Sequence, residues 1–291
     1  MRRRDFVLAG LAAALPAWGS EQRFNRGLLW RIDREGVAPS HVYGTIHVPD
    51  PRLAELPEAV RRSFDAARSL MLEFVPDAYA RERFLEAAMF LDRQTLEEKI
   101  GPEDFERAVE FLDPIGLPRA VINKLKPWGV LLNLRDARRT AHGTPLDTQL
   151  LELARARRMP LYQIEGVEEQ IFTFDEFPMV SQVALLKHNL AHRGELAELT
   201  ERTLEAYLTG DLAAIWRLRE QFIARHPQVA AHQAVMTKRV VHDRSVVMAF
   251  RMQRVLRRGD AFVALGALHL YGEKGVLALL EEDGYRAQRV N

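Results

Sequence analysis

The chain has 291 residues, of which 47% are hydrophobic and 28% charged, and its formal net charge is +1. This composition is typical of a globular protein with a large core, and the balanced charge excludes the basic character expected of a nucleic-acid partner. The sequence contains no cysteine, which excludes disulfides, thiolate metal ligands and a cysteine nucleophile.

The first nineteen residues are typical of an export signal. A basic start, "MRRR", precedes an Ala/Leu-rich stretch (6–15) that is too short to span a bilayer. Small residues in "AWG" (17–19) suit signal-peptidase cleavage, and the order R-R-x-F resembles a twin-arginine signal. We expect residues 1–19 to be a signal peptide and the mature protein to be periplasmic, without a transmembrane segment. A frayed amphipathic helix is the alternative.

Three runs rich in β-forming residues open the mature chain, at 27–33, 41–48 and 69–75. The first two are joined by "REGVAPS", which predicts a hairpin loop. Between the second and third lies a segment (52–67) whose apolar residues recur at helical spacing. The pattern predicts the order strand, strand, helix, strand.

A long helical insertion follows, at about 76–258, and one buried strand near 160–166 is expected to interrupt it. A helix break is expected at Lys126–Pro127. Helix starts are indicated by a capping box, a proline and two capping aspartates: Thr95 with Glu98, Pro102, Asp147 and Asp211.

The chain closes with a predicted strand (260–270), a helix (272–284) and a strand (285–290). This closing unit repeats the order strand, G-x-x-H, helix, strand of the opening unit. We therefore predict a single α/β (α+β) domain over residues 20–291. Its central sheet would consist of two related β-α-β halves, each with a G-x-x-H strand end, and would carry the large helical insertion.

Two G-x-x-H stretches, Gly44–His47 and Gly266–His269, end predicted strands. Each histidine thus stands at the carboxyl end of its strand, where open α/β sheets form ligand crevices. Glu73 is an isolated acidic residue at the end of a third apolar strand. Two histidines and a carboxylate at neighbouring strand ends would form a site for a divalent metal ion such as Mn, Zn, Co or Fe. Such an ion lowers the pKa of bound water and polarises a carbonyl group.

Each candidate also has a structural interpretation. A histidine at a strand end is often a hydrogen-bonded core residue, Glu73 can pair with a basic side chain, and Arg244 can be a helix-surface cation. We interpret the helical histidines, among them His188, His192 and His232, as surface or core residues. His188 and His192 have i,i+4 spacing but lack the H-E-x-x-H signature of a zinc helix.

The sequence resembles the TraB/GumN family, which includes the Tiki proteins and lies in a superfamily with erythromycin esterase-like and ChaN-like proteins. The resemblance covers nearly the whole mature chain. Its specific parts are "YGTIH" and the segment from "VVHDRS" to "AQRV". It implies that Gly44 with His47 and Gly266 with His269 are the paired family motif, with Glu73 as the acidic residue between them.

The resemblance extends to three further positions, Arg244, Glu165 and Gln170. Arg244 matches the arginine of a family "RN" pair, but Ser245 stands where the family has asparagine. Glu165 and Gln170 match a further acidic position and the glutamine after it. A strand-end capping pair is an equally good interpretation of the latter two.

By this resemblance the protein is expected to be an exported, metalloprotease-like hydrolase that acts on a peptide or small-molecule substrate. His47 and His269 would bind the metal, Glu73 would be a ligand or general base, and Arg244 would stabilise developing negative charge. One alternative is a non-catalytic periplasmic binding protein for a peptide or haem-like ligand. Another is an inert structural relative. The sequence specifies neither the metal, the substrate nor the oligomeric state.

Overall fold

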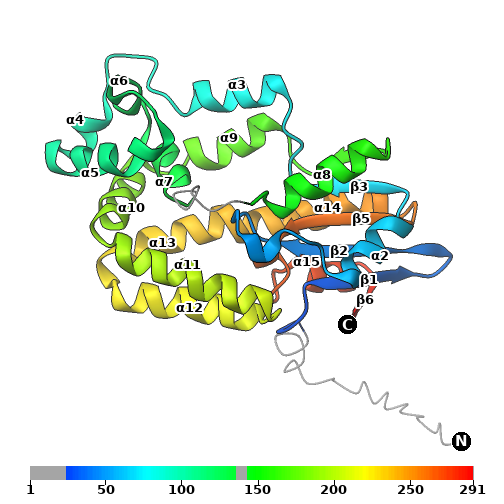
Figure 1. Ribbon diagram of the computed structural model, residues 1–291. Helices are drawn as coiled ribbons and strands as arrows, with labels where there is room; N and C mark the ends of the chain where they lie inside the picture. The colour runs from blue at the N-terminus through cyan, green and yellow to red at the C-terminus, as the bar shows by residue number, and fades with distance from the viewer. Residues whose placement is uncertain (1–23, 136–142, 291) are drawn as a thin grey trace, which may run out of the picture.

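The computed structural model describes residues 24–135 and 143–290. The predicted signal peptide, 1–19, lies outside the described residues. A six-stranded sheet occupies one end of the molecule, and most of the helical insertion extends from it to the other side (Figure 1). Among the described residues, no helix combines the length and hydrophobicity needed to cross a bilayer.

The sheet is mixed, with the strand order β4-β3-β5-β2-β1-β6. The four adjacent strands β4, β3, β5 and β2 are parallel, whereas β1 is antiparallel to both of its neighbours. The strand bounds are β1 (Leu29–Arg34), β2 (Val37–Thr45), β3 (Ser69–Leu72), β4 (Leu161–Gln163), β5 (Ala261–Gly266) and β6 (Arg286–Arg289).

The predicted strands are all present, with three differences. The hairpin between β1 and β2 turns at Glu35–Gly36 rather than through seven residues, because Gly36 takes a φ of +71° that suits a tight turn. The strand expected near 160–166 is a half-buried, three-residue edge strand, not a buried one. The strand expected over 260–270 ends at Gly266 and continues as a 3-10 turn, η5 (Ala267–His269).

Both β-α-β units are present, and they interleave. The first unit is β2, α2 (Glu58–Ala66) and β3, and the second is β5, α15 (Val276–Glu282) and β6. Since β5 lies between β2 and β3, the strand order does not show two separate halves. The arrangement instead makes the two G-x-x-H strands direct neighbours.

The insertion is helical, as predicted, and has its own apolar core away from the sheet. Helices α8 and α14 pack on the sheet core instead, together with the end of α11 and the start of α12. The helices are α3 (Ala78–Ala87), α4 (Leu96–Ile100), α5 (Pro102–Leu112), α6 (Arg119–Ile122), α7 (Pro127–Arg135), α8 (Leu146–Ala156), α9 (Val167–Asp175), α10 (Met179–Ala191), α11 (Arg193–Leu208), α12 (Leu212–Arg225), α13 (Ala230–Thr237) and α14 (Arg244–Leu256). Short 3-10 turns lie at Pro51–Leu53, Asp113–Ile115 and Pro227–Val229, and a π-helical turn at Lys238–Asp243. The single-domain boundary at 20–291 stays a prediction.

Several helix starts follow the sequence signals. The Thr95–Glu98 capping box is formed, Pro102 begins α5, and Asp211 caps α12. The expected helix break at Lys126–Pro127 is present, because α6 ends at Ile122 and α7 begins at Pro127. Asp147 is not an N-cap, because α8 begins after Pro145 and Asp147 lies within its first turn. Its carboxylate contacts Thr45 and His47 instead.

Candidate functional site

The two G-x-x-H motifs lie side by side at the carboxyl edge of the parallel strands. In the register of β2 and β5, Gly44 is paired with Leu265 and Thr45 with Gly266. A Cβ atom on Gly44 would lie 2.6 Å from a methyl carbon of Leu270 and 3.1 Å from the Ala267 Cα. Glycine at position 44 therefore lets the turn that follows β5 pack directly against β2.

Gly266 lies where three candidate ligands converge. A Cβ atom there would lie 3.1 Å from the Glu73 Oε1 atom, 3.6 Å from His269 Cδ2 and 3.8 Å from His47 Nε2. The Gly266 N–H donates a 2.5 Å hydrogen bond to the same Glu73 oxygen. The structure thus brings together the residues that the sequence indicated at three separate strand ends, and any side chain at 266 would fill the space between them.

His269 is buried, with 4% of its surface exposed. The Ser245 hydroxyl donates to the Val241 carbonyl at 2.8 Å, so it accepts the Nδ1–H of His269, also at 2.8 Å. This assigns the lone pair to Nε2, which lies 4.0 Å from Glu73 Oε1. Burial lowers the pKa of His269 to about 4 despite the nearby carboxylate, and the ring is neutral at pH 7.

The second histidine, His47, follows the end of β2 by two residues. Its Nδ1 lies 2.9 Å from Asp147 Oδ2, and Thr45 donates to the other oxygen of that carboxylate at 3.0 Å. The His47 side chain is 61% exposed and lines a cavity of about 240 Å³ together with Glu73, Asp147 and Gln170. This cavity is the solvent-facing side of the site.

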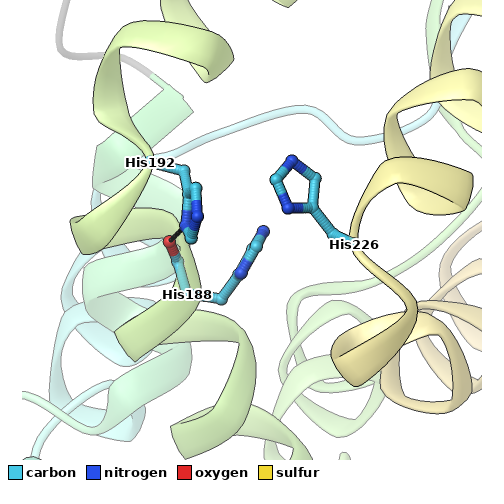
Figure 2. Close-up of side chains that lie close together, drawn as sticks. All are labelled: His188, His192 and His226. Atoms are coloured by element: carbon cyan, nitrogen blue, oxygen red, sulfur yellow. Dashed lines mark hydrogen bonds between the residues drawn. The ribbon is translucent and has the colours of Figure 1, made fainter.

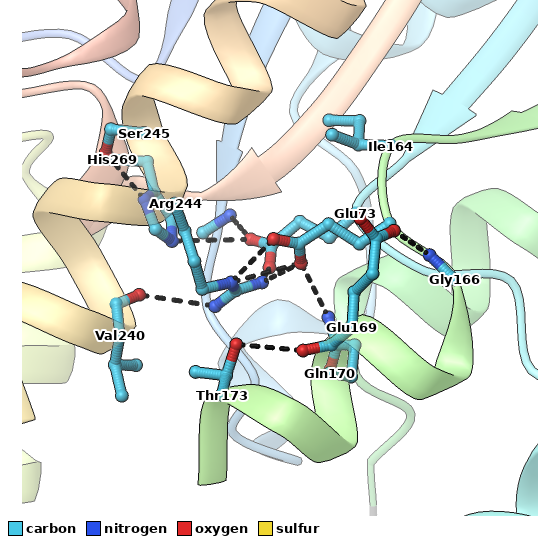
Figure 3. A network of polar contacts seen from close by, with 12 residues as sticks. Glu73, Ile164, Gly166, Glu169, Gln170, Thr173, Val240, Arg244, Ser245 and His269 are labelled. Carbon is cyan, nitrogen blue, oxygen red and sulfur yellow. Dashed lines mark hydrogen bonds and ion pairs between the residues drawn. The ribbon is translucent and has the colours of Figure 1, made fainter. Parts of the chain in front are cut away.

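Glu73, Arg244 and Glu165 form a buried ion-pair network (Figure 3). The Arg244 Nη2 atom lies 2.6 Å from Glu73 Oε2 and 2.7 Å from Glu165 Oε2, and its Nε donates to Glu165 at 3.0 Å. Gln170 donates to Glu165 at 3.0 Å. Two carboxylates and one guanidinium leave a net charge of −1 beside the two imidazoles.

Electrostatics keep this network ionised. Burial alone would raise the pKa of Glu73, but the adjacent His269 and Arg244 lower it more strongly, to about 2. Burial also opposes the charge of Arg244, and the two carboxylates outweigh this effect, so its pKa is raised. Glu73 is therefore an acceptor-only carboxylate at neutral pH.

A π-helical turn, Lys238–Asp243, directly precedes Arg244 and Ser245 at the start of α14. Two carbonyls of this turn, Val240 and Val241, accept hydrogen bonds from these two side chains. These adjacent residues contact different partners. Arg244 donates to the two carboxylates, and Ser245 accepts a hydrogen bond from the imidazole of His269. Wide turns of this kind are frequent at functional sites.

A second group of metal-ligand type lies within the helical insertion. His188 lies in α10, and His192 and His226 directly follow α10 and α12. One nitrogen of each ring lies within 4.8 Å of the others (Figure 2). Our sequence interpretation of these histidines as separate surface or core residues missed this group. The i,i+4 pair was its only signal, since nothing in the sequence links His226 to α10.

The structure pairs His232 differently. Its Nδ1 lies 2.8 Å from the Ser181 hydroxyl of α10. It is half-buried and not part of the three-histidine group.

The sequence is similar to known proteins over most of its length. The profile of the TraB/PrgY/gumN family matches residues 28–289. Metalloprotease TIKI2 from Danio rerio is 24% identical over 92% of this chain and 61% of its own length, so the chain spans about three fifths of that relative. The uncharacterized protein YbaP from Escherichia coli is 24% identical over 82% of this chain and 87% of its own length. No solved structure matches the chain.

Proposed function

We propose that this chain, which belongs to the TraB/PrgY/gumN family, is a metal-dependent hydrolase whose metal ion is held by His47, His269 and Glu73. Metalloprotease relatives at 23–24% identity suggest a metal-dependent hydrolase. The observation that carries the site assignment is the convergence of two imidazoles and a carboxylate on the space beside Gly266.

The donor set suits a divalent transition metal. Each imidazole has its Nδ1 beside a partner, Ser245 for His269 and Asp147 for His47. Such outer partners fix the ring orientation and tautomer of metal-binding histidines, and leave Nε2 for the ion. One ionised carboxylate with two imidazoles suits Zn, Mn, Fe or Co and leaves coordination positions for water or substrate.

A divalent ion held there would supply Lewis-acid polarisation of a substrate carbonyl and a water molecule of lowered pKa. With its own pKa near 2, Glu73 is suited to be an anionic ligand rather than a general base. Arg244 has its Nε and Nη2 donors on Glu73 and Glu165. We therefore propose Arg244 as a positioning residue that orients Glu73, instead of the charge-stabilising role expected from the sequence.

The cavity beside His47 supports a peptide substrate. Its lining combines Gln170 and Thr148 with the apolar side chains of Leu72, Phe74 and Leu151. Hydrogen-bonding groups next to apolar ones suit a peptide segment. Export to the periplasm remains part of the proposal and rests on the pattern of residues 1–19.

The test is hydrolysis of a fluorogenic peptide library by metal-reconstituted protein. We expect activity in the wild type, loss in His47→Ala and His269→Ala, and wild-type activity in the control His232→Ala. Unchanged hydrolysis in His47→Ala would refute the site. Metal binding without turnover, together with a haem Soret shift, would favour the binding-protein alternative.

A further inference from the structure

We propose that His188, His192 and His226 form a second, structural metal site of zinc type, which joins α10 to the end of α12. The three rings pack against one another with centroids 4.2, 4.5 and 4.7 Å apart. Phe222 closes one side, with its ring centroid 4.6 Å from that of His226. Three imidazoles with one nitrogen each within 4.8 Å of the others are a ligand set that suits Zn²⁺.

The strongest indication is a buried nitrogen with no partner. His188 is 6% exposed, and its Nε2 has no hydrogen-bond partner among the described residues. A buried polar atom left unsatisfied costs about 1–3 kcal/mol. A metal ion bound to this lone pair would remove that penalty.

The other two rings also have a nitrogen available. His192 donates its Nδ1–H to the His188 carbonyl at 2.9 Å, which assigns the lone pair to Nε2. His226 has its Nε2 3.1 Å from the Glu195 carboxylate, which leaves Nδ1 for a metal. A carboxylate behind a metal-binding imidazole is the common outer-shell arrangement.

The distances fit a site that contracts on binding. Nitrogens bound to one tetrahedral Zn²⁺ lie about 3.3 Å apart, from metal–nitrogen distances of about 2.0–2.1 Å. The present separations reach up to 4.8 Å, so side-chain rotations suffice to close the site. Water can complete the coordination.

This group is separate from the strand-end site. The start of α12 is held beside the sheet, where Asp211 pairs with Arg26 and the Ala213 N–H donates to the Asn25 carbonyl. His226 follows the other end of this 14-residue helix, about 20 Å away along its axis. We therefore assign the second site a stabilising role in the helical insertion.

The test titrates Co²⁺ into the full, untagged chain that carries His47→Ala and His269→Ala, so that the strand-end site is disabled. We expect one equivalent to bind with the strong visible absorption of four-coordinate Co²⁺, and Zn²⁺ to raise the melting temperature. Adding His192→Asn removes a ligand and should weaken binding by at least the roughly 10–100-fold that loss of an outer partner causes, and it should abolish the thermal shift. Asparagine retains a donor near the Nδ1 position, which preserves the contact with His188.

The matched control is His232→Asn, the same substitution at a helical histidine outside the group, and it should leave Co²⁺ binding unchanged. Absence of Co²⁺ binding in the disabled background, or binding unaffected by His192→Asn, would overturn the proposal. Hydrolysis by the His192→Asn single variant separates this proposal from the proposed function. We expect wild-type turnover, and its loss would overturn the assignment of a separate structural site.

Discussion

Replacing Ser245 with alanine removes the hydroxyl that joins Val241 to His269. Both hydrogen bonds measure 2.8 Å, and both Ser245 and His269 are almost fully buried. The variant leaves the Nδ1–H of His269 without this acceptor in a site that water does not reach. We expect a loss of about 1–3 kcal/mol in the free energy of unfolding, and a ring that no longer presents Nε2 toward Glu73.

Loss of such a partner lowers metal affinity by about 10–100-fold, which corresponds to about 1.4–2.8 kcal/mol. The assay is Zn²⁺ competition with a chromophoric chelator in the His192→Asn background, where only the strand-end site remains. The matched control is Ser181→Ala, because the buried Ser181 hydroxyl contacts Nδ1 of His232 at the same 2.8 Å. We expect Ser181→Ala to lose comparable stability without losing affinity. Wild-type affinity in Ser245→Ala, or an equal loss in Ser181→Ala, would refute the reasoning.

Three further predictions follow from the same contacts. Gly266→Ala places a methyl group 3.1 Å from Glu73 Oε1 and should reduce Zn²⁺ affinity at least about 10-fold. The control Gly194→Ala, which has no atom within 4 Å of its Cβ, should keep the wild-type affinity. Equal affinities in the two variants would contradict the crowding of the site at position 266. Arg244→Met leaves two buried carboxylates without their cation and should lower the free energy of unfolding in urea by about 3–5 kcal/mol. The control Arg251→Met breaks an exposed ion pair and should cost less than about 1 kcal/mol. Similar losses in the two variants would argue against a buried network. In metal-free protein, the free energy of unfolding should fall as pH is lowered from 6.5 to 4. Burial lowers the pKa of His269 from 6.5 to about 4, so in this pH range the unfolded state binds a proton that the folded state does not. That contribution is about 3 kcal/mol at about 1.4 kcal/mol per pKa unit, and an unchanged pH slope in His269→Asn would count against it.

Local patterns predicted the strands correctly, whereas the metal-binding role of the strand-end residues stays a prediction. Alternating β-forming residues marked every strand, and the G-x-x-H repeats indicated the two motifs that the sheet brings together. Strand ends are informative because parallel neighbours place their carboxyl ends at one edge. Sequence alone could not show that β5 inserts between β2 and β3, since pairing between distant strands leaves no local pattern.

The residues that sequence reasoning missed act through tertiary contacts. The sequence predicts Asp147 as a helix cap, whereas its contact with His47 depends on how α8 packs over the sheet. The pairing of Ser245 with His269 depends on the π-helical turn before α14. No residue pattern in the sequence indicated that turn. The three-histidine group joins residues of two helices, of which only the His188–His192 spacing was visible in the sequence.

The most direct test of the strand-end metal site is elemental analysis of untagged protein purified without chelator, in the His192→Asn background. We expect near one equivalent of Zn, Mn, Co or Fe per chain, and none after His47→Ala and His269→Ala are added. Peptide hydrolysis should disappear with the metal. Equal metal content with and without these two histidines would show that they do not hold the ion.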